Sequence, residues 1–206
     1  MKKFPLFLKL ALILVCTTQW SGAQFFYDFP QVFESVLIQK FNISASKVGL
    51  LYTYAAMPNL FINIFASILV AKIGLGASLP IFQTLLFIGV CLIYLAVSTS
   101  NYTLLLAGRM FVGMSFDVTA VGQLLAVEKW FSGSSLTFVL GVANCISYCS
   151  QSLAAYLLPR IYLKTRNLDN PVMLVGAFSA ITFASATIYF LIDRKYSGML
   201  KEVKNQ

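Results

Sequence analysis

Two ionisable residues, Arg109 and Asp117, lie inside the apolar stretch 104–131. An ionised side chain at the centre of a membrane-spanning helix costs about 2.5–3.5 kcal/mol on insertion scales, so a helix facing lipid on all sides would not keep two of them. On a helix that turns by about 100° per residue, Arg109, Gly113 and Asp117 form one sloping stripe. Gln123 falls about 40° to the other side of Arg109. We therefore expect this face to look into a protein interior or a wet cavity, with Gly113 keeping it open.

The polar stripe has two possible roles. Ionisable residues inside a membrane usually mark a path for solutes or protons, which would make Arg109 and Asp117 solute-binding or proton-coupling groups. Alternatively, they are structural charges that lock neighbouring helices together. Eight residues of helix separate the two by about 12 Å along the axis, which is too far for direct contact in most rotamers. Each residue therefore needs its own partner, from another helix or from solute and water.

The composition identifies the class of protein that must position this stripe. Of the 206 residues, 59% are hydrophobic and only 11% are charged, whereas soluble domains carry about 25% charged residues. The chain is therefore predicted to be an integral membrane protein in contact with lipid. Its net charge of +8 does not indicate nucleic-acid binding, because the basic residues lie mostly at the ends of apolar runs instead of forming a patch.

Residue types that catalysis usually requires are missing. There is no histidine, which removes the commonest general base and metal ligand. The sequence has no Gly-x-Ser-x-Gly elbow and no cluster with metal-ligand spacing. The four cysteines fall inside apolar segments, which argues against a disulfide framework. We therefore predict a protein that is not an enzyme and that holds no metal or cofactor.

Six apolar runs predict an all-α fold, with residues 1–206 as a single transmembrane domain. The predicted spans cover about 5–27, 48–71, 79–97, 102–127, 136–158 and 172–192. The first run could instead be a cleaved signal peptide, because a basic start, an apolar centre and small residues precede Gln24. Since the apolar character continues to Tyr27, we favour a retained helix. Segments 29–47 and 159–171 are predicted to be polar loops.

Polar residues on the other spans extend the predicted solute path. Tyr52 and Asn59 give the second span a polar face, and Pro58 in the middle of the span is expected to be tolerated because neighbouring helices can satisfy the freed backbone. We expect Tyr52, Asn59 and Gln123 to line the path. Asp28, at the far end of the first span, is expected at its luminal mouth.

The distribution of Lys and Arg predicts the orientation. With six spans both termini share one side, and eight basic residues fall on that side against five on the other, Lys9 and Arg109 lying within spans. This excess favours cytosolic termini. Asn42 opens an Asn-x-Ser acceptor in the long luminal loop and is predicted to carry a glycan. Asn101 opens a second acceptor, but it lies directly against the next helix and is predicted to stay unmodified.

Six spans with Arg109-x-x-x-Gly113 opening the fourth resemble the first half of a major facilitator superfamily transporter. Three motifs carry a closer resemblance, to the lysosomal dipeptide-transporter branch: Tyr27-Asp28-x-Pro30, Leu50-Leu51-Tyr52…Pro58-Asn59 and Gly108-Arg109…Gly113…Asp117…Gln123…Trp130-Phe131-x-Gly133. The resemblance implies half of a twelve-helix bundle. Such a half would move dipeptides or amino-acid-like solutes by alternating access, as a uniporter of the endolysosomal membrane. It also implies a second six-helix bundle or a second copy as partner, and a glycosylated accessory membrane protein.

Three positions depart from the family pattern. The turn between the second and third spans usually carries an Asp-Arg pair, where this chain has Ala71-Lys72. The fourth-helix acid is commonly Glu and is Asp117 here. Tyr148 stands where the dipeptide branch has an arginine, so a peptide carboxylate would lose its cationic partner and meet Tyr148 instead. A chain with these changes is either a transporting half, an incomplete or relict carrier, or a non-transporting assembly subunit that uses the polar face to dock a partner.

Overall fold

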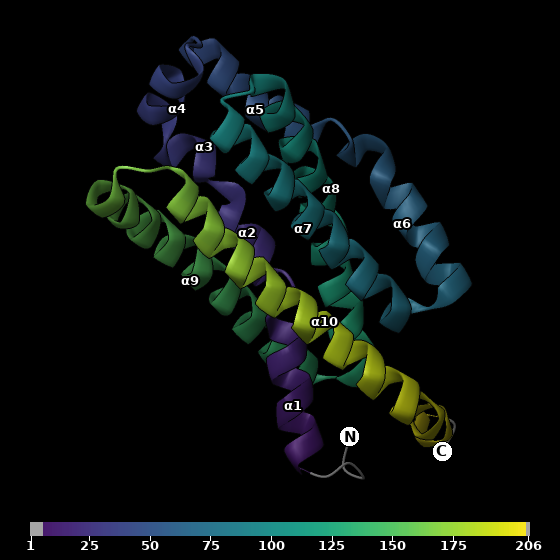
Figure 1. Cartoon of the computed structure of the whole chain (residues 1–206). Coiled ribbons are helices and arrows are strands. Elements are labelled where there is room, and N and C mark those ends of the chain that lie inside the picture. Colours follow the sequence, from purple (N-terminus) through teal and green to yellow (C-terminus); the bar gives the residue numbers. More distant parts are fainter. Residues whose placement is uncertain (1–5, 205–206) are drawn as a thin grey trace.

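The structure is a computed structural model that describes residues 6–204, with side-chain surroundings for 7–196. Within this range the chain forms ten helices joined by short turns (Figure 1). They are α1 (Leu6–Thr17), α2 (Ser21–Tyr27), α3 (Phe29–Val32), α4 (Glu34–Phe41), α5 (Ala45–Ala56), α6 (Asn59–Ile73), α7 (Leu75–Thr99), α8 (Tyr102–Trp130), α9 (Ser134–Thr165) and α10 (Asp169–Lys204).

Five segments are long and apolar enough to cross a membrane. They are Ala45–Ile73, Leu75–Thr99, Tyr102–Trp130, Ser134–Thr165 and Asp169–Tyr196. The predicted first span is not one continuous helix, since α1 has 12 residues, α2 has 7, and a turn at 18–20 separates them. This interruption is the main difference from six uninterrupted spans.

The second span, predicted as one helix that tolerates Pro58, is interrupted at that proline. α5 ends at Ala56 and α6 begins at Asn59, with Pro58 between them, because proline lacks the N–H that would continue the helical ladder. α5 packs on α8, whereas α6 leans away from the bundle and buries none of its residues (Figure 1). The interruption therefore lets one half of the span join the core while the other half stays outside it.

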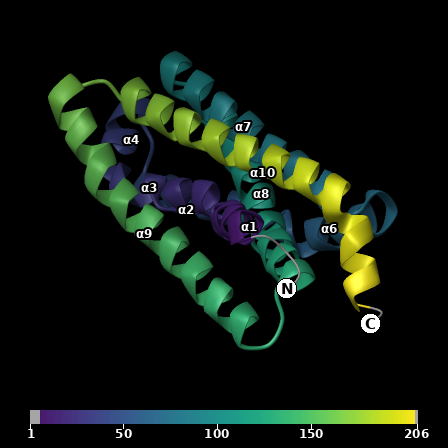
Figure 2. The ribbon, with the colours of Figure 1, turned by 90° about the horizontal axis from the view of Figure 1, so that it is seen from below.

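The remaining helices form two sides of the bundle. α7 packs along both α8 and α10. A Cβ placed on Gly108 of α8 would lie 3.0 Å from the Gly89 carbonyl oxygen of α7, so small residues allow this close approach. Seen from below, α1 and α2 run between α9 and α8, while α7 and α10 lie together on the opposite side (Figure 2). The side formed by α9, α2, α8 and α5 carries the predicted polar residues.

Two segments predicted as loops contain helix. α3 and α4 occupy most of 29–47, and α9 continues through Pro159 to Thr165, where a loop was expected from residue 159. Proline is tolerated inside a membrane helix because neighbouring groups re-satisfy the freed backbone. The extension of α9 brings Tyr162 against Phe33, with ring centroids 5.7 Å apart.

An acidic side chain from another helix lies beside the turn between α6 and α7. Asp193 of α10 lies against Gly76, since a Cβ there would come within 2.6 Å of the Asp193 carboxylate. The same carboxylate forms an ion pair with Lys129 of α8 at 2.5 Å. Asp193 thus places a carboxylate beside the turn whose own sequence lacks one.

Candidate solute-binding site

The turn between α1 and α2 leaves backbone groups inside the bundle, and three other helices satisfy them. Gln83 of α7 donates from its side-chain Nε2 to the Gln19 carbonyl at 2.5 Å. Gln123 of α8 accepts from the Trp20 backbone N–H at 2.9 Å. On α9, the Ser150 hydroxyl donates to the carbonyl of the residue that begins α2, at 3.0 Å. Unpaired backbone groups are costly away from water, so these side chains stabilise the interruption.

Arg109 stabilises the other end of α2. The side chain is only 1% exposed, and its two terminal nitrogens donate to the carbonyls of Phe26 at 3.3 Å and Tyr27 at 3.2 Å. These carbonyls end α2, where the helix dipole favours a cation. The guanidinium also lies 5.5 Å from the centre of the Tyr52 ring, within the range of a cation–π contact. Arg109 therefore binds backbone and rings, and no carboxylate lies within 4 Å of it among residues 7–196.

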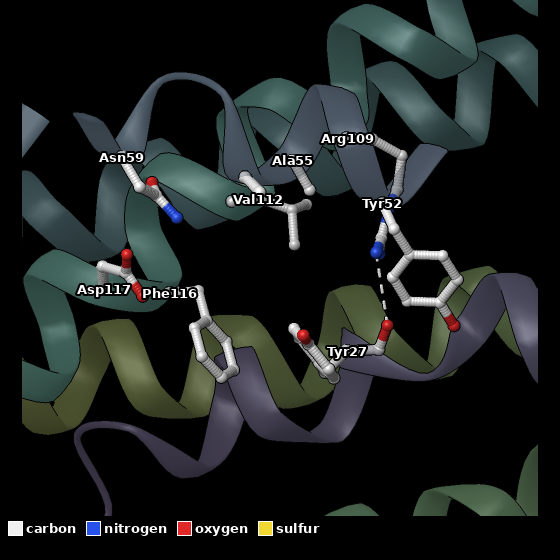
Figure 3. A pocket seen from close by; sticks show the side chains of 10 residues that line it. Tyr27, Tyr52, Ala55, Asn59, Arg109, Val112, Phe116 and Asp117 are labelled. Carbon is white, nitrogen blue, oxygen red and sulfur yellow. Dashed lines mark hydrogen bonds between the residues drawn. The ribbon is translucent and has the colours of Figure 1, made fainter. Parts of the chain in front are cut away.

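A cavity of about 90 Å³ lies beside Arg109, between α2, α5, the start of α6 and α8. Four predicted site residues line it: Tyr52, Asn59, Arg109 and Asp117. In Figure 3, Asn59 and Asp117 lie at one end of the cavity, and Arg109 and Tyr52 lie at the other. The structure therefore brings these four side chains together around one space, with Tyr27 and Phe116 as further lining residues.

Several polar atoms at this cavity are buried without a partner in the described part of the chain. They are the Asn59 Oδ1, the Arg109 Nε and the Tyr52 hydroxyl, which lies near the Gln31 backbone N–H without a well-aligned hydrogen bond. The half-buried Asp117 carboxylate likewise makes no hydrogen bond or ion pair with residues 7–196. Buried polar groups in folded proteins nearly always find a partner, so each exception needs an explanation. A cluster of such groups around one space is the arrangement expected of a site that binds a polar ligand.

Gly113 has a different role from the one the sequence suggested. It does not keep the face open, because α5 covers it: a Cβ there would collide with the Ala55 carbonyl. The missing side chain lets the backbones of α5 and α8 meet, as small residues do between membrane helices. This close approach carries Tyr52 and Asn59 to the cavity.

The other predicted site residues lie outside the cavity. Gln123 is buried at the turn before α2, as described above. The Asp28 carboxylate accepts a hydrogen bond from Gln151 of α9 at 2.6 Å, which ties the end of α2 to α9. Tyr148 of α9 is 55% exposed, and its ring centroid lies 6.2 Å from that of Trp20. Rotation of a helix about its own axis decides which neighbour each of these residues meets, and sequence spacing alone does not give that rotation.

Three aromatic residues at this site were not predicted as site residues: Trp20, Tyr27 and Phe116. Tyr27 and Phe116 line the cavity, with ring centroids 4.6 Å apart. Their positions gave a usable signal, because Tyr27 precedes Asp28 and Phe116 precedes Asp117. Each was treated as part of an apolar run instead of as a neighbour of the polar face.

Residues 11–205 match the family model of the Major Facilitator Superfamily. This chain belongs to that superfamily. Among curated relatives, this facilitator chain is 26% identical over 134 residues to the lysosomal dipeptide transporter MFSD1 of Danio rerio, covering 65% of the chain and 29% of that protein. The Homo sapiens protein of the same name is 25% identical over 160 residues, covering 77% of the chain and 34% of that protein. The match thus spans about a third of each relative's length, and the resemblance to the dipeptide-transporter branch is confirmed.

Family membership and these relatives support a multi-pass membrane protein of the transporter class. The cavity of this facilitator chain, at about 90 Å³, is smaller than the ~300–1,000 Å³ of typical small-molecule pockets. It has room for part of a small solute. Tyr27, one of the residues that line it, is 38% exposed.

Proposed function

We propose that this chain acts as one half of a carrier that moves a small organic solute, such as a dipeptide or an amino-acid-like molecule, by alternating access. The observation that carries the proposal is the group of unpartnered polar atoms around the cavity beside Asp117. Carriers of this type bind solute near the midplane, between two bundles that rock against each other. The names of the relatives support dipeptides as the first solutes to test.

Each cavity residue has a proposed task. Asp117 binds a protonated amine of the solute or carries a proton, since an unpaired carboxylate suits either task. The Tyr52 hydroxyl and the Asn59 amide hydrogen-bond the polar part of the solute. Arg109 positions α2 and offers its free Nε to the cavity. In this scheme Arg109 contacts the solute through one nitrogen, while its other two hold the backbone.

The predicted residues outside the cavity have proposed tasks as well. Gln123 holds the interrupted first span in place. Asp28, bonded to Gln151, lies at the luminal mouth of the path. Tyr148 contacts solute on the way to the cavity, which agrees with its exposure.

The partner of this half is proposed to be a second six-helix bundle, either from another chain or from a second copy of this one. α1 and α2 together then supply the sixth crossing. α6 supports the need for cover, because it buries no residue and its Phe61 and Phe65 are 63% and 66% exposed. The endolysosomal membrane is proposed as the location, following the name of the relatives. A glycosylated accessory membrane protein is proposed as a further partner, following the family resemblance of the sequence.

Both termini are proposed to be cytosolic, with a glycan on Asn42 in the lumen. Asn42 ends α4 in a left-handed conformation, at the turn before α5. Asn101 is engaged differently, since its side-chain oxygen accepts from the backbone N–H groups of Thr103 and Leu104 at the start of α8. Expression in a glycosylating host should give a glycosidase-sensitive band that Asn42→Gln removes and Asn101→Gln does not. A shift that survives Asn42→Gln would contradict this topology.

The decisive experiment measures uptake of a labelled dipeptide into liposomes that contain the purified chain, alone and with a co-expressed second bundle. Asp117→Asn should reduce uptake at least tenfold, because hydrogen bonds to a charged group contribute about 1.5–3 kcal/mol. Glu128→Gln is the matched control, since it makes the same chemical change at an exposed position of α8. Equal uptake by the two variants would overturn the assigned role of Asp117.

A non-transporting assembly subunit is the second candidate. Arg109 favours this candidate, because its two terminal nitrogens donate to backbone carbonyls at the end of α2. A charged residue within the membrane therefore also stabilises the fold in this chain. This candidate predicts no uptake in any combination of bundles, together with stable co-purification of a membrane partner. Co-purification that is lost in the Asp117→Asn variant would favour it over the carrier.

A further inference from the structure

Five aromatic rings form a continuous row across the side of the bundle that carries the cavity. The aromatic row consists of Tyr52, Tyr27, Phe116, Trp20 and Tyr148. Successive ring centroids lie 6.2, 4.6, 5.3 and 6.2 Å apart. All four separations fall in the range in which rings attract one another. The row starts in the cavity, at α5 and α2, and passes over α8 to end on α9.

Trp20 is the link between the cavity and α9. Its ring meets Phe116 and Tyr148 nearly edge-on, at 62° and 71°. Its backbone N–H is held by Gln123, so the residue is fixed at the interruption of the first span. Its indole N–H is buried and has no acceptor among the described residues. No hydrogen bond therefore fixes the orientation of the indole, which is set by packing on the core and on the two rings, and a ligand that adds a ring contact can adjust it.

The row differs from an ordinary aromatic core pair. Phe25 and Phe178 are such a pair, with centroids 4.6 Å apart on the far side of α2 and with Phe25 almost fully buried. In the row, Tyr148 is more than half exposed, Tyr27 is exposed and Trp20 is half-buried. Partly exposed rings that continue out of a cavity lined by polar groups are placed to meet a ligand that occupies both.

We propose that Trp20 determines solute specificity and that, with Phe116 and Tyr148, it forms a subsite for the non-polar side group of the solute. The inference rests on the proposed function and extends it, since it names the chemical class of the solute. The polar part of the solute lies in the cavity, and an aromatic or large aliphatic group lies against the indole. A solute with no such side group gains no binding free energy from the aromatic row.

Intrinsic fluorescence tests the subsite without requiring transport. The chain has two tryptophans, and Trp130 lies elsewhere, donating its indole N–H to the Tyr189 hydroxyl. In Trp130→Phe, the dipeptide Phe-Ala should change the emission of Trp20 in a saturable way, whereas Gly-Ala should do so only at roughly tenfold higher concentration. Trp20→Phe is the control and should show no change in the emission of Trp130.

Equilibrium binding of the same two dipeptides tests the specificity. The full chain should bind Phe-Ala roughly tenfold more tightly than Gly-Ala, and Trp20→Ala should bring the ratio below about twofold. Trp20→Phe keeps a ring and should retain most of the preference, which guards against a fold defect in the alanine variant. Phe138→Ala, an exposed aromatic of α9 outside the row, should leave the ratio unchanged.

Three outcomes would overturn the subsite: no response of Trp20 to Phe-Ala, equal binding of the two dipeptides, or an unchanged ratio in Trp20→Ala. Failure of the proposed function has a different signature. If the chain binds Phe-Ala with the expected preference but no combination of bundles moves it, transport fails and the subsite stands.

Discussion

The interruption between α1 and α2 and the cavity beside Asp117 are both polar regions inside an apolar bundle, yet their hydrogen bonding differs. At the interruption, the Gln19 carbonyl and the Trp20 N–H each meet a side chain from another helix. At the cavity, the Asn59 carbonyl oxygen has no partner in the described chain, and the Tyr52 hydroxyl has no well-aligned one. The interruption has its backbone groups satisfied by side chains, although the Gln19 Oε1 and the Trp20 indole N–H there are also buried without a partner. The unpartnered groups of the second region differ in that they surround one cavity. In a membrane protein, the state of the hydrogen bonds separates structural polarity from functional polarity better than the presence of polar residues does.

Arg109 belongs to both regions and should show the largest effect on stability. Arg109→Met keeps much of the volume but removes the donors to the Phe26 and Tyr27 carbonyls. The loss of two hydrogen bonds from a charged donor should lower the free energy of unfolding by about 2–5 kcal/mol, although the Phe26 carbonyl still accepts from the Asp28 backbone N–H. Unfolding in mixed micelles measures the change, and Arg160→Met is the control, because Arg160 is exposed at the end of α9. An equal loss of unfolding free energy in the two variants would show that the hydrogen bonds of Arg109 do not stabilise the fold.

Gly113 should show the next largest effect. Gly113→Ala forces α5 away from α8 because the new Cβ collides with the Ala55 carbonyl, and overpacking of this kind costs about 1–3 kcal/mol. Gly141→Ala is the control, since nothing lies within 4 Å of a Cβ there. The control should be neutral or slightly stabilising, because alanine favours helix. The yield of monodisperse protein on size exclusion distinguishes the two variants, and a normal yield from Gly113→Ala would contradict the close packing.

Substitution of Gln123 tests only the stability of the interruption between α1 and α2. Gln123→Leu leaves the Trp20 backbone N–H without its acceptor, which should cost about 1–3 kcal/mol. Gln123→Glu keeps an acceptor oxygen and separates loss of the bond from loss of shape. The expected result is a lower midpoint of unfolding for the leucine variant, with the affinity for dipeptide changed little in the protein that remains folded. A large loss of affinity for the dipeptide at unchanged stability would show that Gln123 contributes to the binding site instead of to the stability of the interruption.

Tyr52 should show the smallest effect on stability and a clear effect on binding. Tyr52→Phe removes a buried hydroxyl whose contact with the Gln31 backbone N–H is not a well-aligned hydrogen bond, so the free energy of unfolding should change by less than about 0.5 kcal/mol. Affinity for the solute should fall about three- to tenfold, as expected for one lost hydrogen bond. Tyr54→Phe, on the exposed face of α5, is the control. Destabilisation by Tyr52→Phe would show that the hydroxyl is satisfied within the protein.

Local patterns in the sequence predicted a large part of this architecture. Long apolar runs located the long helices. Pro58 was expected to be tolerated within the second span, whereas the helix ends just before it, because proline removes a backbone donor. Local patterns also placed Tyr52, Asn59, Arg109 and Asp117 on polar faces. The turn at 18–20 could not be found in this way, since it contains neither proline nor glycine. Its stability depends on Gln83 and on residues still further along the chain.

Sequence-based predictions were also wrong where they depended on how helices rotate and approach one another. Gly113 was expected to leave space, but a missing side chain can equally let another backbone fill it. Tyr148 shares a side of the bundle with the cavity yet does not line it, because α2 runs between α9 and much of α8 (Figure 2). Such outcomes depend on which helix becomes the neighbour, and that information is not contained in any one segment.

The interrupted first span has a consequence for biosynthesis. α1 and α2 leave the ribosome before α7, α8 and α9, which carry the side chains that satisfy their backbone. Until those helices arrive, the carbonyl of Gln19 and the N–H of Trp20 need water or the insertion machinery as partners, because lipid offers none. The first span therefore reaches its final hydrogen bonding only after these later helices are made. Synthesis stopped within α8, before Gln123, would leave the first span with unsatisfied backbone groups and make it the part of the nascent chain most dependent on chaperones of the membrane.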